Sequence, residues 1–364
     1  MEGSFSLSEY MGRGIENIVK SVIKASLRNP KETAFVMQYM LSSREAKRKR
    51  DMLESKGQSI PPFLIASITS SCNLFCKGCY ARANKCCSEG TDKNQLSTER
   101  WGDIFKEAKE LGISFILLAG GEPLMRMEVL KKAAEIREIM FPVFTNGTMM
   151  DETYIDLFNK NRNLVPILSI EGDEEQTDKR RGVGVYNALM RSMNDLKKKD
   201  ILFGASITVT TENIEKVTSR AFLDNLYSKG CKALIFVEYV PVTEEAKEIA
   251  PTDRERSILE SEQEKLWSEY EDVIFLSFPG DEKYTGGCLA AGRGFFHINV
   301  NGSAEPCPFS PYSDVNLKDC SLIEALNSQL FKKLKESEML IGEHSGGCLL
   351  FEKESEVKRL LFAE

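Results

Sequence analysis

The chain has 364 residues, and its 48 Lys and Arg residues against 55 Asp and Glu residues leave a net charge of −7. An acidic chain lacks the clustered cations that nucleic-acid phosphates require, and we interpret the short basic run 44–50 as a solvated helix face. No apolar run approaches the ~20 residues of a membrane span, and residues 1–10 do not resemble a signal peptide. We therefore expect a cytoplasmic protein with neither nucleic-acid nor membrane partners.

The chain has ten cysteines but only two histidines, His297 and His344. Thiols stay reduced in the cytosol, where clustered cysteines bind metals more often than they form disulfides. Two histidines leave little material for a histidine-rich metal site or a Ser-His-Asp triad. The cysteines are therefore the residues that carry the functional signal.

Residues 1–58 are predicted to be helical, because apolar residues recur at helical spacing over 15–23 and again over 35–40. Asn29-Pro30 divides the two helices, and the stretch from Gly57 to Pro62 closes the segment. We expect these helices to serve as a packing face.

Residues 59–272 form the second predicted unit, in which short apolar strands alternate with amphipathic helices. The predicted strands are 63–69, 113–119, 140–145, 164–170, 201–209 and 233–240, and the predicted helices are about 98–111, 127–138, 151–160, 187–199 and 214–229. Alternation of this kind predicts parallel pairing in an α/β barrel, a partial barrel or a doubly wound sheet. In all three, chemistry gathers at the carboxyl ends of the strands.

A charged helix is predicted over 252–271, and residues 273–364 then form a third unit with a different texture. Residues 279–312 are rich in Gly, Pro and Cys and contain one strand-like piece, 295–300. Such a stretch cannot build a core unaided, so we expect it to depend on a metal. A helix near 321–336 and a tail complete this small module.

Three thiols, Cys72, Cys76 and Cys79, follow the first predicted strand within eight residues. A closed zinc site or an ordinary cubane cluster needs four ligands, so three leave one iron open for a substrate or cofactor. A zinc loop that borrows a distant fourth cysteine is the alternative, although zinc ligands more often come as two separate pairs.

This spacing resembles the C-x-x-x-C-x-x-C signature of the radical S-adenosylmethionine (SAM) superfamily. The resemblance implies a partial (β/α)6 TIM-type barrel and a [4Fe–4S] cluster held by Cys72, Cys76 and Cys79, with SAM on the fourth iron. It also implies anaerobic chemistry in which a low-potential donor such as ferredoxin or flavodoxin reduces the cluster. SAM is then cleaved, and a 5′-deoxyadenosyl radical abstracts hydrogen from the substrate. Many members have an adenine-contacting aromatic residue just before the last cysteine, whereas this chain has Gly78, with Tyr80 nearby.

Further positions match the SAM-binding residues of the family. The Gly-Gly-Glu-Pro run after the second strand suits an ammonium group, because glycines let backbone carbonyls approach a ligand and a carboxylate stands beside them. The resemblance assigns SAM contacts to Gly120, Gly121, Glu122, Pro123, Asn146, Ser169, Glu171, Arg181, Ser206, Thr208 and Asn213, with Tyr80 as the substitute aromatic residue. Arg180, next to Arg181, is interpreted as a surface cation.

A second cysteine pattern lies in the C-terminal module. Cys288, Gly302 and Cys307 resemble the start of SPASM and Twitch domains, which carry auxiliary [4Fe–4S] clusters. The resemblance implies one auxiliary cluster with Cys348 as a further ligand. Cys320 is the candidate fourth ligand, although a small buried residue would also fit its position at a helix start. A zinc ribbon or plain thiols are the alternatives to the cluster. The remaining thiols match no family position. We interpret Cys86 and Cys87 as loop thiols and Cys231 as a core residue.

The family resemblance names the chemistry and leaves several substrates open. A peptide or protein side chain is our first expectation, and a tetrapyrrole or another small metabolite is the alternative. Asp281, Glu282 and Glu238, with Tyr239 beside the last, are candidate catalytic acids or bases. Arg293 would bind an anionic group or brace the cluster loop. Two other classes stay open: a non-catalytic iron–sulfur electron carrier and a zinc-stabilised binding module.

Overall fold

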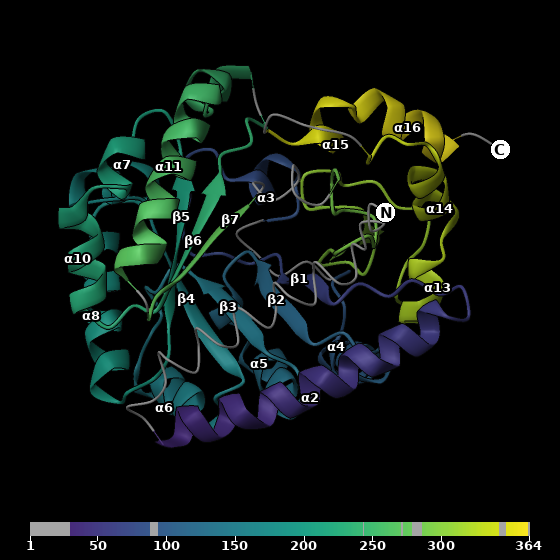
Figure 1. The fold of residues 1–364 in the computed structure, drawn as a ribbon, viewed down its shortest axis with the longest axis horizontal. Coiled ribbons are helices and arrows are strands. Elements are labelled where there is room, and N and C mark those ends of the chain that lie inside the picture. Colours follow the sequence, from purple (N-terminus) through teal and green to yellow (C-terminus); the bar gives the residue numbers. More distant parts are fainter. Residues whose placement is uncertain are drawn as a thin grey trace, which may run out of the picture.

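The computed structural model describes residues 30–87, 94–242, 244–270, 272–278, 286–341 and 347–362. Its centre is a curved parallel sheet (Figure 1). The parallel strands are β1 (Phe63–Thr69), β2 (Phe115–Gly120), β3 (Phe141–Thr145), β4 (Leu164–Ile170), β5 (Gly204–Val209), β6 (Ala233–Glu238) and β7 (Ile274–Phe278). The sheet continues past β1 through β8 (His297–Ile298) and β9 (Ala304–Glu305), in the order β7-β6-β5-β4-β3-β2-β1-β8-β9. The predicted fold class, an α/β partial barrel with parallel strands, is confirmed.

Helices on the outer side of the sheet bury one face of each strand. On β2, the outward residues Ile116 and Leu118 are fully buried, whereas the inward Leu117 is only half-buried. The covering elements are α4 (Thr98–Leu111), α5 (Met127–Ala134), α6 (Glu152–Lys160), α7 (Glu174–Arg181), α8 (Val185–Lys198), α9 (Ile214–Val217), α10 (Arg220–Ser228) and α11 (Asp253–Glu269). This alternation along the strands is the pattern of a sheet covered on its outer side.

Most predicted elements occur, and the differences have local causes. The helix predicted over 214–229 is two helices, α9 and α10. The second begins after Ser219, whose side chain accepts a hydrogen bond from Phe222 N and so caps α10. Strand β7 and helix α7 were not predicted. β7 pairs in parallel with β6, so the barrel sheet extends into the range that we assigned to the C-terminal module.

Helix α2 (Pro30–Glu54) closes the amino-terminal end of the barrel, where it crosses beneath the strands in Figure 1. Its buried residues Phe35, Val36 and Tyr39 form a cluster with inward-facing strand residues such as Val165 and Ile167. The Tyr39 hydroxyl also donates a hydrogen bond to Ser114 O at 3.0 Å. The helix predicted before Pro30 lies outside the described residues.

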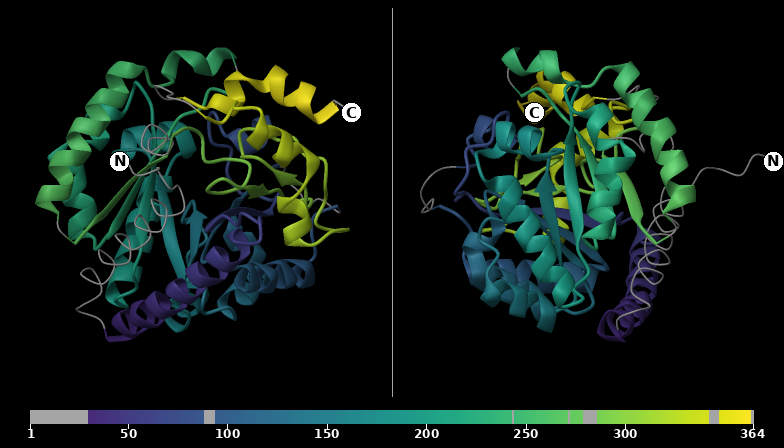
Figure 2. Two further views of the ribbon diagram at one scale, coloured as in Figure 1. Left: turned by 45° about the vertical axis from the view of Figure 1, so that its right-hand side comes forward. Right: turned by 90° about the vertical axis from the view of Figure 1, so that its left-hand side faces the viewer.

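The C-terminal module lies at the β1 edge of the barrel sheet, to the right of the sheet in the left-hand view of Figure 2. β8 pairs in parallel with β1, with Ile65 opposite His297, and β9 pairs antiparallel with β8. The helices of this module are α13 (Leu322–Leu326), α14 (Gln329–Glu336), α15 (Leu349–Glu352) and α16 (Glu354–Phe362). No helix in the described ranges is long and apolar enough to cross a membrane.

Replacement of Tyr39 with alanine tests the role of α2. The substitution removes a fully buried ring from the cluster that α2 forms with the inward-facing strand residues. We therefore expect the free energy of unfolding to fall by about 3 kcal/mol or more. Met37→Ala is the matched control on the same helix, because Met37 is 61% exposed and its loss should cost less than about 0.5 kcal/mol. Denaturant unfolding measures both variants, and equal stabilities would show that α2 is not part of the core.

Candidate active site

The loop that carries Cys72 lies directly on the two glycines at the end of β2. Gly121 N donates a hydrogen bond to Thr69 O at 2.7 Å. A Cβ atom on Gly120 would lie 2.5 Å from Thr69 O, and one on Gly121 would lie 2.6 Å from the carbonyl carbon of Ser71. Because backbone atoms cannot swing aside as a side chain can, these positions accept only glycine. The contact fixes the cysteine loop to the end of β2.

Glu122 joins the ends of β2 and β3. Its buried carboxylate accepts hydrogen bonds from Leu124 N at 3.0 Å, Thr145 Oγ1 at 2.7 Å and Asn146 N at 2.8 Å. Burial raises the pKa of Glu122, and these hydrogen bonds oppose the rise. The short helix η1 (Pro123–Arg126) begins at Pro123, with Glu122 as its cap. Glu122 therefore shapes the glycine motif, since most of its hydrogen-bonding capacity is used within the protein.

Asn146 connects the end of β3 to the cysteine loop. Its amide nitrogen donates to Asn73 Oδ1 at 2.9 Å, and its Oδ1 accepts from Thr148 N at 3.0 Å. Asn73 in turn donates to Thr148 Oγ1 at 2.8 Å. Asn73, which directly follows the first cysteine of the motif, is thus held by Asn146 and Thr148, two residues that follow β3.

Glu171, at the end of β4, is paired with two arginines. Its Oε1 accepts from Arg180 Nη1 and from Arg181 Nε, both at 2.7 Å, and its Oε2 accepts from Thr208 N at 3.2 Å. Burial lowers the pKa of Arg181 and the Glu171 carboxylate raises it, with a net rise. The interpretation of Arg180 as a surface cation was wrong, because its side chain is held at this carboxylate.

The remaining predicted SAM contacts lie on or beside β4 and β5. Ser169 and Ser206 are opposite each other in the register of the two strands. Asn213 donates to Glu171 O at 3.0 Å and to Thr208 O at 2.8 Å, so its amide joins the two strand ends. Asn213 is therefore placed as a structural link between β4 and β5.

Cations lie close to two thiols of the motif, Cys76 and Cys79. Burial raises the pKa of Cys76, Arg181 and Arg180 oppose this rise, and the charges of Cys79 and Cys72 add to it. No three His, Cys, Asp or Glu side chains among the described residues are grouped to hold a single metal ion. A four-iron cluster distributes its cysteines over separate irons, so its ligands need a wider spacing than those of one ion. Three neighbouring thiols with two nearby guanidinium groups fit such a cluster.

Cys87 is a fourth thiol at this site that the sequence analysis assigned to a loop. Its thiol forms a hydrogen bond with the Cys72 thiol, which lowers the pKa of Cys87 and raises that of Cys72. The charges of Cys79 and Cys76 also act on Cys87. Its position shortly after Cys79 in the sequence was the signal that could have assigned Cys87 to this site.

Tyr80 points toward the C-terminal module. Its ring contacts Phe309 with 5.2 Å between ring centroids. Burial raises the pKa of Tyr80, and the charges of Cys79, Cys86 and Cys307 add to this effect. Tyr80 thus lies between the two cysteine groups.

Three cysteines of the C-terminal module lie together. Burial raises the pKa of Cys307 well above its usual value, and a hydrogen bond with the Cys348 thiol and the charge of Cys288 raise it further. Cys320 lies elsewhere, at the start of α13. The charges that act on its thiol come mainly from Glu324 and Arg100.

Two candidate catalytic residues, Asp281 and Glu282, lie outside the described residues. The third, Glu238, accepts hydrogen bonds from Arg256 Nη2 at 2.6 Å and from Gly347 N at 3.0 Å. These hydrogen bonds connect Glu238 to α11 and to Gly347, the residue before Cys348. Arg293 donates to Cys288 O at 2.5 Å and to Leu340 O at 2.8 Å, which fits the bracing role.

A buried chain of hydrogen bonds joins the barrel to the C-terminal module. Ser67 Oγ lies 2.8 Å from His297 Nε2, and His297 Nδ1 lies 2.7 Å from Glu305 Oε2. The sequence analysis had left little room for a Ser-His-acid arrangement. All three side chains are at most 4% exposed, so the arrangement here is a buried link between β1, β8 and β9.

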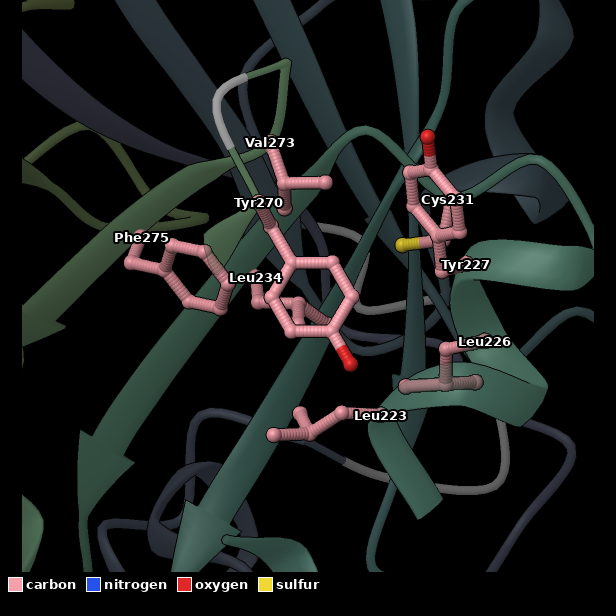
Figure 3. Close-up of a pocket in the computed structure, with 8 residues that line it drawn as sticks. All are labelled: Leu223, Leu226, Tyr227, Cys231, Leu234, Tyr270, Val273 and Phe275. Carbon is pink, nitrogen blue, oxygen red and sulfur yellow. The ribbon is translucent and has the colours of Figure 1, made fainter. Parts of the chain in front are cut away.

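A small apolar pocket lies outside the barrel, beside α10, β6 and β7 (Figure 3). It is lined by Leu223, Leu226, Tyr227, Cys231, Leu234, Tyr270, Val273 and Phe275. Its empty volume of about 200 Å³ is below the range of ordinary ligand sites. Cys231 is a core residue on its wall, and the pocket is separate from both cysteine groups.

Replacement of Gly121 with alanine tests the contact between the cysteine loop and β2. The new Cβ would overlap the Ser71 carbonyl group, so we expect unfolding free energy to fall by about 1–3 kcal/mol and iron uptake to decrease. Gly102→Ala is the control. Gly102 lies inside α4, where alanine favours the helix, and its new Cβ would meet only the flexible side chain of Lys132. Denaturant unfolding and iron analysis after reconstitution compare the two, and normal iron uptake by Gly121→Ala would contradict the interpretation.

Comparisons with known proteins point to one superfamily. The AdoMet-dependent heme synthase of Methanosarcina barkeri is 26% identical over 312 residues, which cover 78% of this chain and 87% of the relative. The sporulation killing factor maturation protein SkfB of Bacillus subtilis is 26% identical over 44% of this chain and 38% of its own.

The fold is also shared with SuiB of Streptococcus suis bound to S-adenosylmethionine. That structure superposes with a TM-score of 0.69 at 17% identity, over 88% of this chain and 82% of SuiB. Residues 66–222 match the family model described as Radical SAM superfamily, and they contain the three-cysteine motif, the glycine motif and the Glu171–Arg181 pair. The chain thus contains a radical SAM superfamily domain over residues 66–222.

Proposed function

We propose that this chain is an enzyme that cleaves SAM at a [4Fe–4S] cluster held by Cys72, Cys76 and Cys79, and that it abstracts a hydrogen atom from its substrate. The bound cluster and SAM supply the 5′-deoxyadenosyl radical. The observation that carries the proposal is the backbone contact between the cysteine loop and Gly120-Gly121, which places the thiols beside the glycine motif. An electron carrier without SAM would not need this second motif.

The protein side chains would bind and orient SAM. Arg181 lies close enough to Cys76 and Cys79 for their charges to raise its pKa, so its guanidinium is suited to a carboxylate beside the cluster. Glu171 holds that guanidinium in place through its hydrogen bonds. Gly120 and Gly121 leave backbone carbonyls accessible to an ammonium group. Asn146 and Asn213 support the loops that carry these groups.

The C-terminal cysteines would hold an auxiliary cluster. Cys288, Cys307 and Cys348 are the supporting set, and Glu238 positions Gly347 beside the last of them. Cys320 is not part of this proposal, because its neighbours belong to α4 and α13. A reduced donor such as ferredoxin or flavodoxin would supply electrons to the enzyme.

The extent of the alignments favours a tetrapyrrole as substrate over our first expectation of a peptide. The heme synthase aligns with most of this chain, including much of the C-terminal half, whereas SkfB aligns over less than half of either protein. The fold of SuiB, which has also been solved with a precursor peptide, keeps the peptide class as the second candidate.

Anaerobic reconstitution with iron and sulfide, followed by reduction with dithionite and addition of SAM, tests the reaction. We expect 5′-deoxyadenosine by chromatography and about eight irons per chain from two cubane clusters. Zinc without iron binding would favour a binding module. Iron binding without SAM binding would favour an electron carrier.

Single cysteine replacements separate the two clusters. Alanine at Cys72, Cys76 or Cys79 should abolish SAM cleavage, and cleavage retained by any of the three would contradict the assignment. Cys307→Ala should reduce the iron to about four per chain and spare the first cluster. Cys320→Ala is the matched control in the same module, with an unchanged iron content. If Cys307→Ala also kept all its iron, the auxiliary cluster would be ruled out.

Stimulation of SAM cleavage distinguishes the substrate classes. Iron coproporphyrin III is the tetrapyrrole probe, because a second relative is the Fe-coproporphyrin III synthase of Methanosarcina barkeri, 28% identical over 54% of this chain and 49% of its own. It should increase the rate of 5′-deoxyadenosine formation and be changed in mass. A stimulated rate without a change in the mass of the porphyrin would contradict its role as substrate. No stimulation at all would favour the peptide class.

A further inference from the structure

The two residues that flank Cys76 are exposed to solvent. Phe75, directly before this cysteine, is 62% exposed, and Lys77, directly after it, is also exposed. Consecutive Cα atoms lie only about 3.8 Å apart, so both residues share the short backbone segment that carries the thiol. The outer side of the cysteine loop is therefore a surface of the protein, one residue away from a proposed cluster ligand.

Arg82 holds the Phe75 ring in its exposed position. The Arg82 guanidinium lies over the ring, 3.9 Å from its centroid, and its Nη2 donates to Leu74 O at 2.6 Å. Arg82 belongs to the short helix α3 (Tyr80–Ala83), which directly follows the last cysteine of the motif. A cation over the face of an aromatic ring is attractive, and a ring that is already oriented loses little freedom when a partner binds.

The charge of this surface is opposite to that of the whole chain. The charged residues between Cys72 and Cys87 are all basic: Lys77, Arg82 and Lys85. The net charge of the chain is −7. Lys77 N donates to Arg180 O at 2.9 Å, which places the end of α7 against the loop. Arg180 is paired with Glu171, whereas Lys77 forms no ion pair with any carboxylate in the described ranges. Positive charge is thus available beside the exposed ring.

We propose that the face formed by Phe75, Lys77 and Arg82 is the docking site of an acidic one-electron carrier protein. The proposal rests on the proposed function, because the carrier is needed only if the neighbouring cysteines hold the cluster. One electron would pass from the reduced carrier to the cluster, so the carrier is oxidised, the cluster is reduced and no covalent bond changes. Binding at Phe75 brings the carrier to the segment that holds Cys76.

The chemistry of the face fits such a partner. Complementary charge steers an acidic protein toward a basic surface, and exposed aromatic rings are enriched at the centres of interfaces. Transient electron-transfer complexes bury less than about 1,200 Å², so a face of a few residues is sufficient. A second copy of this chain fits less well, because a two-fold contact would bring the same cations against each other.

The rate of 5′-deoxyadenosine formation with two reductants tests the docking site. Dithionite is a small ion that needs no docking, whereas flavodoxin, an acidic carrier kept reduced by NADPH and its reductase, must bind. Phe75→Ala and Lys77→Glu should each lower the rate at limiting flavodoxin by about tenfold. The iron content and the rate with dithionite should stay unchanged.

Two matched controls lie toward the other end of the barrel. Met37→Ala removes an exposed apolar side chain from α2, which lies at the opposite end of the barrel from α3 in Figure 1. Lys56→Glu reverses an exposed charge just after α2. Neither substitution should change the rate with either reductant.

The salt dependence gives a second measurement on the same proteins. Salt screens attraction between exposed charges, so the flavodoxin-supported rate of the unmodified enzyme should fall as the salt concentration rises. Lys77→Glu should make this fall shallower, because one of the attracting charges has been reversed. An equally steep fall in Lys77→Glu would contradict a role for Lys77 in attracting the carrier.

Other outcomes would overturn the proposal as a whole. Equal losses with flavodoxin and dithionite would mean that these residues shape the cysteine loop, and unchanged rates in both variants would mean that the carrier binds elsewhere. Activation of the unmodified enzyme by dithionite, but by neither flavodoxin nor ferredoxin, would exclude an acidic carrier. A dimer in sedimentation that Phe75→Ala converts to a monomer would assign the face to a second copy.

Failure of the proposed function would give a different result. In that case the unmodified, iron-loaded protein would form no 5′-deoxyadenosine even with dithionite, and the docking site would fail with it.

Discussion

The contact between the backbone of the cysteine loop and the glycines of β2 is the constraint on which the rest of the site depends. At Gly120 and Gly121 two segments of backbone touch with no side chain between them. Neither segment can therefore shift without moving the other. Glu122 and Asn146 extend this rigidity to β3, because they bond to the residues around the same contact. The position of the thiols is thus determined by strand ends.

Buried charge is balanced within the same region. Glu171 compensates two guanidinium groups, and both cations also lie near the Cys76 thiol. Thiolate ligands carry negative charge, which neighbouring cations stabilise. Removal of Glu171 would leave two partly buried cations with a changed orientation, so this carboxylate acts on the site through the arginines. Glu122 has a different role, because its partners are mainly neutral donors.

Local patterns in the sequence were enough to predict the barrel, and they were not enough to predict its polar connections. β1, β4 and α4 have the predicted bounds, because the two strands are short, nearly continuous apolar runs and the apolar residues of α4 follow the helix period. β7 was missed although its apolar run resembles the other strands, since it follows directly on the charged helix α11. The contact of the Tyr239 ring with Gly78, on which a Cβ atom would lie 2.8 Å from Tyr239 Cζ, has no local signal at all. It arises from the order of strands around the sheet, which places the end of β6 above the loop that follows β1.

The join between the barrel and the C-terminal module determines how the two cysteine groups are spaced. β1 is followed by the loop that carries Cys72, and β1 also pairs with β8 of the C-terminal module. The buried hydrogen bonds from Ser67 through His297 reach Glu305, two residues before Cys307. One strand therefore supports both groups, with Tyr80 between them. If both groups hold clusters as proposed, their separation is a property of the sheet, and any displacement of β1 would alter both sites at once.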